Sequence, residues 1–135
     1  MDYDAVNKQF GFYKVFELIN NSWIINNPLD PVPKICHPNE KYEQEIDEYW
    51  IQTHVDIGER SKYFMMGSIR FTLTCPNNVG IGRGYELIAF LARIVDDKQI
   101  DNVWTERLTN PISTQVDDNY LIIANLIYHM KFCGN

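Results

Sequence analysis

Apolar residues recur at two different periods along this chain, and the two periods separate expected helices from expected strands. From Ala5 to Trp23 they lie on two adjoining stripes at helical spacing, which predicts a first helix. From Leu87 to Val95 they form one stripe, which predicts a second helix covering one face of a sheet. Alternation at period two predicts strands at Tyr49–Val55 and Phe64–Cys75, and the polar turn between them predicts an antiparallel hairpin.

Two further strands are predicted near the end of the chain, at Val103–Leu108 and Tyr120–Phe132. Much of the last strand is apolar on both faces, so both faces need cover, either from two helices or from a neighbouring subunit. The resulting order is α-β-β-α-β-β. It predicts a single two-layer α+β domain over residues 1–135, in which a mainly antiparallel four-stranded sheet packs with two helices.

Between the first helix and the hairpin lies a proline-rich segment, at about residues 26–47, that holds four of the six prolines. Proline at this density prevents regular helix and favours extended, turn-rich backbone. The segment is also longer than an ordinary connection between elements. We therefore expect an extended arm that contacts another molecule.

Three glycines, Gly80, Gly82 and Gly84, precede the second helix and leave two interpretations open: a phosphate-binding loop or a flexible entry into the helix. The dinucleotide-binding pattern is Gly-x-Gly-x-x-Gly, whereas here Tyr85 holds the third glycine position. The Walker pattern also fails, because Tyr85 and Glu86 stand where Lys-Ser/Thr is required. Both nucleotide-binding patterns are therefore weak.

Composition and charge narrow the classes of function. A hydrophobic content of 45% indicates a folded chain, and a formal net charge of −6 without any basic run argues against a nucleic-acid-binding surface. The longest apolar-rich segment, Leu121–Tyr128, is interrupted by Asn125 and is too short to span a membrane. Three cysteines at wide spacings do not suit a disulfide framework, which favours assembly in a reducing cytoplasm.

The sequence contains no clear catalytic or metal-binding pattern. Cys36 and His37 are adjacent, but no second pair of ligands follows at metal-binding spacing, so neither a metal nor another cofactor is expected. His54 and His129 lie on the less apolar faces of strands, without a catalytic partner at a recognisable spacing. The acidic cluster between Glu40 and Glu48 fits a solvated charge run better than paired catalytic carboxylates. We therefore do not expect an enzyme, although a small enzyme or ligand-binding domain that uses the glycine loop and His54 stays open.

Tryptophans indicate assembly instead. Trp23, Trp50 and Trp104 are spread through a chain that has 13% aromatic residues, and protein interfaces are enriched in aromatic residues, Met and Arg. Burial in the core explains the same residues equally well. Together with a last strand that is apolar on both faces, they suggest a surface that another subunit covers.

The predicted elements, taken in order, resemble those of a tailed-bacteriophage tail terminator, a family that includes the tail-tube capping proteins of long-tailed phages. The resemblance covers nearly the whole chain and rests on its size, the leading helix, the proline-rich segment and the two terminal strands. It also rests on the hairpin EYWIQTHVDIGERSKYFMMGSIRFTLTCP and on the glycine-containing turn into a helix, VGIGRGYELIAFLARIVDD.

This resemblance implies a structural virion protein that forms a homo-oligomeric ring, typically a hexamer, at the junction of tail and neck. Such a ring caps the tail tube, ends its polymerisation and provides the attachment surface for the head. The implied partners are further copies of the chain, the tail tube protein, a head-completion or neck protein and, in a contractile tail, the sheath protein. DNA passes through the lumen without specific binding, and no membrane is involved. The implied place of assembly is the host bacterial cytoplasm. A head-closure or neck adaptor protein of the connector is the alternative within the virion.

On this interpretation the glycine loop is a permissive turn that displays Arg83 at its tip. Candidate subunit contacts follow from these assignments. They are the two outward-facing strand tryptophans, two residues of the glycine loop and three residues of the arm, namely Trp50, Trp104, Ile81, Arg83, Pro31, Val32 and Pro33.

Overall fold

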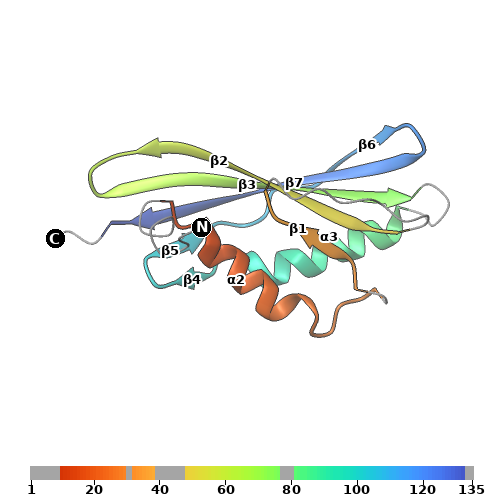
Figure 1. Ribbon diagram of the computed structural model, residues 1–135, viewed down its shortest axis with the longest axis horizontal. Helices are drawn as coiled ribbons and strands as arrows, with labels where there is room; N and C mark the ends of the chain where they lie inside the picture. Colours follow the sequence, from red (N-terminus) through yellow and green to blue (C-terminus); the bar gives the residue numbers. More distant parts are fainter. Residues whose placement is uncertain (1–9, 30–31, 39–47, 77–80, 133–135) are drawn as a thin grey trace.

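A computed structural model describes residues 10–29, 32–38, 48–76 and 81–132 of the chain (Figure 1). Among these residues a long, curled sheet has two helices on one of its faces. The helices are α2 (Phe12–Trp23) and α3 (Gly82–Val95). The strands are β1 (Lys34–Cys36), β2 (Trp50–Arg60), β3 (Phe64–Pro76), β4 (Gln99–Ile100), β5 (Val103–Thr105), β6 (Ile112–Val116) and β7 (Asn119–Lys131).

The centre of the sheet is the antiparallel pair of its two longest strands, β3 and β7, which stay in register from Phe64 opposite Lys131 to Pro76 opposite Asn119. The strand order is β1-β2-β3-β7-β5-β4, and β6 also pairs with β7. β5 and β6 share one edge of β7 because they pair with opposite ends of it, Tyr128–Met130 and Asn119–Ile123 respectively. The sheet thereby curls into a half-barrel.

The predicted four-stranded sheet and the predicted order α-β-β-α-β-β are wrong. In the described part of the chain the sheet has seven strands, and it is mixed, since β1 runs parallel to β2. The three strands missed by the sequence pattern, β1, β4 and β6, are short or fully exposed, so they carry little alternation between buried and exposed positions. β1 lies within the proline-rich segment, where Lys34, Ile35 and Cys36 form an edge strand between Pro33 and Pro38.

The predicted hairpin is confirmed, with longer strands than expected. β2 continues through a register shift between Ile57 and Arg60, so the turn shortens to the residues around Lys62. The first helix begins at Phe12, directly after Gly11, which has a φ of 72°. The expected start of this helix, near Ala5, lies outside the described residues.

The core lies between the helices and the sheet face that they cover. α2 contributes Val15, Phe16, Ile19 and Trp23, and α3 contributes Leu87, Ile88, Leu91, Ile94 and Val95. The sheet contributes alternate residues of its central strands, among them Ile69, Phe71, Leu73, Ile122, Ala124 and Leu126. The helices therefore cover only one of the two apolar faces of β7, which leaves the other face without a helix in the described chain.

Gly84 lies where α3 approaches the sheet most closely. A Cβ atom built at this position would overlap Cys75 Sγ and would approach Ile122 Cδ1 to 2.8 Å. Gly82 and Gly84 are both helical residues of α3, so the expectation of a glycine turn with Arg83 at its tip is wrong for this part of the segment. At Gly84 a side chain is excluded by packing, rather than by backbone conformation. Gly80 lies outside the described residues.

Neither of the described helices is long and apolar enough to cross a membrane.

Candidate functional site

The face of the sheet opposite α2 and α3 has no helix over it in the described residues (Figure 1), and we call it the open face. Side chains alternate between the two faces of a strand, so the open-face residues are those between the buried core positions. They are Trp50, Gln52, His54 and Asp56 of β2, Met66, Ser68, Arg70, Thr72 and Thr74 of β3, Trp104 of β5, Ile112 and Thr114 of β6, and Leu121, Ile123, Asn125, Ile127 and His129 of β7.

Aliphatic residues run along β7 through this face. Leu121, Ile123 and Ile127 are each half-buried, although their neighbours Ile122, Ala124 and Leu126 are fully buried on the helix side. Ile112 of β6 pairs with Ile123 and has 71% of its surface exposed. We call these four residues the apolar row, in which exposed Asn125 separates Ile127 from Ile123. Exposed apolar surface of this kind is characteristic of interaction sites.

Trp104 lies at one end of the open face, where it stacks on His129. The two ring centroids are 5.3 Å apart and the ring planes differ by 14°. His129 Nε2 lies 2.5 Å from Glu106 Oε2, so the carboxylate holds the imidazole at its ring edge. The indole is thus supported by its neighbours and presents a preorganised aromatic surface, which lowers the entropy lost on binding.

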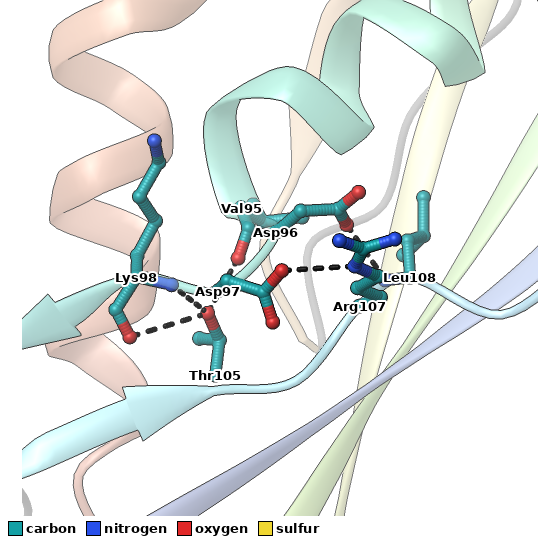
Figure 2. A network of polar contacts seen from close by, with 7 residues as sticks. All are labelled: Val95, Asp96, Asp97, Lys98, Thr105, Arg107 and Leu108. Carbon is teal, nitrogen blue, oxygen red and sulfur yellow. Dashed lines mark hydrogen bonds and ion pairs between the residues drawn. The ribbon is translucent and has the colours of Figure 1, made fainter.

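A polar network behind the open face fixes the strand that carries Trp104 (Figure 2). The hydroxyl of Thr105 is buried; it donates to the carbonyl of Val95 at 2.5 Å and accepts from the backbone N–H of Lys98 at 2.9 Å. Asp96 Oδ1 accepts from the N–H of Leu108 at 2.7 Å, and this bond ties the end of α3 to the residues after β5. Since Thr105 points into the core, its neighbour Trp104 must point to the open face.

An exposed ion pair extends the same network at the protein surface. Arg107 Nε lies 2.9 Å from Asp97 Oδ2, and both side chains are more than half exposed. Hydrogen bonding to Asp97 raises the pKa of the Arg107 guanidinium, which stays charged. Because the pair is in contact with solvent, it defines geometry more than it adds stability.

Trp50 lies at the opposite end of the open face from Trp104. It is the first residue of β2, it is half-buried, and it aligns with Lys34 on one side and with Thr74 on the other. Thr74 is in turn opposite Leu121, at one end of the apolar row. The structure thus brings both predicted strand tryptophans to one face, with aliphatic residues and the exposed Asn125 of β7 between them.

The middle of the open face is polar. His54 pairs with Arg70 across β2 and β3, and Arg70 pairs with Asn125 of β7. His54 Nε2 lies 3.2 Å from Asp56 Oδ1, with both side chains more than half exposed. Polar groups beside apolar ones fix the orientation and the register in which a surface binds its partner.

Ile81 and Arg83 lie on the helix side, away from the open face. Ile81 is half-buried and packs against the core as the N-cap residue of α3. Arg83 belongs to the first turn of α3, where its guanidinium is 3.6 Å from Glu86 in an exposed i, i+3 pair. If these residues contact a subunit, they do so through a different surface from the one that carries Trp50 and Trp104.

The described part of the proline-rich arm is bound to its own domain. Pro33 is buried and its carbonyl accepts a hydrogen bond from Trp23 Nε1 at 2.7 Å. The carbonyl of Cys36 accepts from Thr53 Oγ1 at 2.8 Å. Val32 has 37% of its surface exposed and is therefore available for a contact. Pro31 lies outside the described residues.

A cavity of about 620 Å³ lies beside the end of the open face that carries Trp104, between the tip of the β2–β3 hairpin and β7. Sequence reasoning missed it, because its walls come from segments far apart in the chain. It is lined by Glu59, Arg60, Ser61, Phe64, Met65, Met66 and His129. The guanidinium of Arg60 lies 5.2 Å from the ring centroid of Phe132, so the cation is held against an aromatic surface.

Two titratable groups near these surfaces are buried, as is typical of packing residues and not of nucleophiles. Burial raises the pKa of the Cys75 thiol to about 12, so this sulfur stays protonated. Burial also raises the pKa of Tyr128, whose hydroxyl donates to the carbonyl of Phe10 at 2.6 Å. Within the described ranges no cluster of three or more His, Cys, Asp or Glu side chains is arranged to hold a metal ion.

No family model matches the sequence, and no curated protein matches it. Five solved chains match the structure. One of them shares the fold with a TM-score of 0.65 over 89% of this chain and 98% of its own length, at 13% sequence identity. Its name states no activity, ligand or partner. At this identity the likeness concerns the fold alone.

Proposed function

We propose that this chain is a structural virion protein, a ring-forming tail terminator that caps the tail tube of a tailed phage. The observation that carries the proposal is the open face, where Trp50 and Trp104 stand at the two ends and the apolar row lies between them. Tryptophan and other aromatic residues are enriched in protein interfaces. The assignment to tail terminators in particular rests on the sequence resemblance described above.

A ring of identical subunits needs two different complementary patches on each subunit, because such contacts close around a rotation axis. The open face supplies one patch. The opposite, helix-bearing side supplies the other, and it carries Arg83 and Ile81. The mechanism is geometric: one face of the ring copies the stacking surface of the tube, and the other face offers no site for a further tube subunit.

The proposal includes the partners and the location that the resemblance implies. The ring binds the tail tube protein on one side and a head-completion or neck protein on the other, with the sheath protein as a further partner in a contractile tail. DNA passes through the lumen without specific binding, consistent with the net charge of −6. The chain acts without enzymatic activity, metal or other cofactor, at the junction of tail and neck.

The cavity beside Trp104 favours the second candidate, a small ligand-binding domain or enzyme. Its lining combines Arg60 and His129 with Phe64 and Met66, a mixture of charged and apolar groups common in ligand sites. The open face would serve as an interface in a neck adaptor protein equally well, so the position in the particle distinguishes it from a tail terminator.

Electron microscopy of phage particles labelled with an antibody to this chain tests the proposal. A tail terminator places the label in a ring at the end of the tail tube, and it is present on tails that have not yet joined a head. A neck adaptor is labelled on heads and is absent from free tails. Particles without any label, together with a purified chain that stays monomeric and binds a small molecule, would refute assembly altogether.

A further inference from the structure

The cavity beside Trp104 is large enough to hold a small organic molecule. Its volume of about 620 Å³ falls within the range of ligand pockets, roughly 300–1,000 Å³. Its walls come from the end of β2, the start of β3 and His129 of β7. Neighbouring strands hold these walls in register, so the cavity is formed before any ligand binds.

A β-bulge in β2 brings a carboxylate to the cavity. The register of β2 against β3 shifts between Ile57 and Arg60. Gly58 and Glu59 therefore stand together opposite one residue of β3, Met66. A Cβ atom built at Gly58 would lie 3.6 Å from Met66 Cε, so the bulge adjoins the Met66 side chain. Bulges re-aim side chains and are over-represented beside active sites, and here exposed Glu59 lines the cavity with Met66.

The cation next to Glu59 is directed to the other face of the sheet. Arg60 pairs with Met65, which is buried in the core on the helix side. The Arg60 guanidinium lies 5.2 Å from the ring centroid of Phe132 and 5.9 Å from that of Phe10. Both rings pack against the core. Arg60 therefore lines the cavity without turning its charge toward the open face.

The charges that remain near the cavity favour a cationic ligand. Lys131 is on the open face opposite Phe64, but it lies outside the cavity lining. Glu59 is part of that lining, and a second carboxylate, Glu106, contacts the imidazole of His129. In a chain of net charge −6 the cavity therefore attracts a cation more than an anion.

The rest of the wall on the open face is aromatic or sulfur-containing. Phe64 has 52% of its surface exposed, and Met66 is half-buried. Cations are attracted to the faces of aromatic rings, and the flexible thioether of methionine adapts to the shape of a ligand. The cavity thus combines a carboxylate with apolar surface, as a ligand with an ammonium group on an apolar body requires.

We propose that this cavity binds a small organic amine, whose ammonium group pairs with Glu59 and whose apolar body lies against Phe64 and Met66. The inference rests on the second candidate function, a ligand-binding domain, and does not require a ring. On the open face His129 stands between Met66 of β3 and Trp104 of β5. A bound ligand therefore changes the surroundings of the stacked pair, and the indole N–H of Trp104 reports binding.

Three probes with the same benzene ring test the charge of the ligand. At neutral pH benzylamine is a cation, benzyl alcohol is neutral and benzoate is an anion. Each is titrated into the full chain below the concentration at which light scattering detects an oligomer. The NMR signal of the Trp104 indole, identified by its loss in Trp104→Phe, measures the dissociation constant. Benzylamine should bind at least about fivefold more tightly than benzoate, with benzyl alcohol between them.

A substitution with a matched control tests the carboxylate. Glu59→Gln preserves the size of the side chain, removes its charge and should weaken benzylamine binding about fivefold. Glu86→Gln is the control, because Glu86 is an exposed carboxylate on α3, away from the cavity. It should leave the dissociation constant unchanged. Thermal unfolding verifies that both variants are folded.

The outcomes separate this inference from the proposed ring. If no probe binds at millimolar concentrations, the ligand site is refuted, while ring formation is decided by light scattering alone. Benzoate that binds as tightly as benzylamine overturns the cationic ligand. An equal loss of benzylamine affinity in Glu59→Gln and Glu86→Gln would show that the overall charge of the chain, and not Glu59, attracts the amine.

Discussion

The indole of Trp104 lies nearly parallel to the imidazole of His129, with 5.3 Å between ring centroids and 14° between ring planes. Glu106 holds the same imidazole by a contact of 2.5 Å to Nε2. These residues come from β5, β7 and the segment between them, so their arrangement depends on the pairing of Trp104 with His129 across the sheet. It places a supported aromatic ring at one end of the open face.

Trp104→Ala should weaken ring formation while the isolated subunit stays folded. The indole is half-buried and belongs to the open face, so its removal affects the interface more than the core. Loss of a hot-spot aromatic costs about 2 kcal/mol or more, which corresponds to about 30-fold in the dissociation constant. Analytical ultracentrifugation measures this change. Trp104→Phe, which keeps an aromatic ring, should retain most of the affinity, and unchanged ring stability in the alanine variant would exclude Trp104 from the contact.

Gly84→Ala should destabilise the fold, whereas Gly82→Ala should not. An added Cβ at Gly84 meets Cys75 Sγ and Ile122 Cδ1, and such overpacking costs roughly 1–3 kcal/mol. At Gly82 nothing lies within 4 Å of the added atom, and alanine in a helix is favoured over glycine by about 0.5–1 kcal/mol. Urea unfolding of the two variants measures the difference. Equal stabilities would mean that α3 is not held this close to the sheet.

Thr105→Val should destabilise the fold by about 1–3 kcal/mol, because it leaves the carbonyl of Val95 and the N–H of Lys98 without the hydroxyl that satisfies them. The substitution preserves shape and β-branching, so the loss reports the hydrogen bonds. Thr114→Val on exposed β6 is the matched control and should change stability by no more than about 0.5 kcal/mol. Both are measured by chemical denaturation. A Thr105→Val chain as stable as the control would contradict the network in Figure 2.

Stability should fall at alkaline pH, in part through Cys75. Burial raises the pKa of this thiol from 9.0 to about 12, so the unfolded chain loses its proton before the folded chain does. The contribution is complete below about pH 9 and is lost as the pH rises towards 12. The gap in unfolding free energy between the unmodified chain and Cys75→Ala should therefore narrow between about pH 8 and pH 11. A gap that stays constant over this range would show that the thiol is accessible to solvent.

The strongly alternating strands could be predicted from sequence, because burial on one face imposes a period of two. β3 and β7 are long enough for this pattern to be clear, and α3 has a single apolar stripe. β6 could not be predicted in this way, since all its residues are exposed and only its pairing with β7 defines it. β1 was hidden by its proline-rich surroundings, although Lys34, Ile35 and Cys36 retain the N–H groups that an edge strand needs.

The candidate site could be predicted only in part. Strand period placed Trp50 and Trp104 at outward positions, but only the register of β7 shows that they share one face. The pairing of His129 with Glu106 joins residues 23 apart and has no recognisable spacing. At Gly84 the sequence suggested backbone freedom, whereas the structure shows a helical residue whose missing side chain allows contact with Cys75.

The mass of the purified chain, measured by light scattering during size-exclusion chromatography over a range of concentrations, tests most directly whether the open face is covered by copies of the same chain. The account predicts a closed oligomer of one defined stoichiometry in equilibrium with the 15.9 kDa subunit, visible as rings in electron micrographs. A chain that stays at 15.9 kDa at every concentration would contradict it.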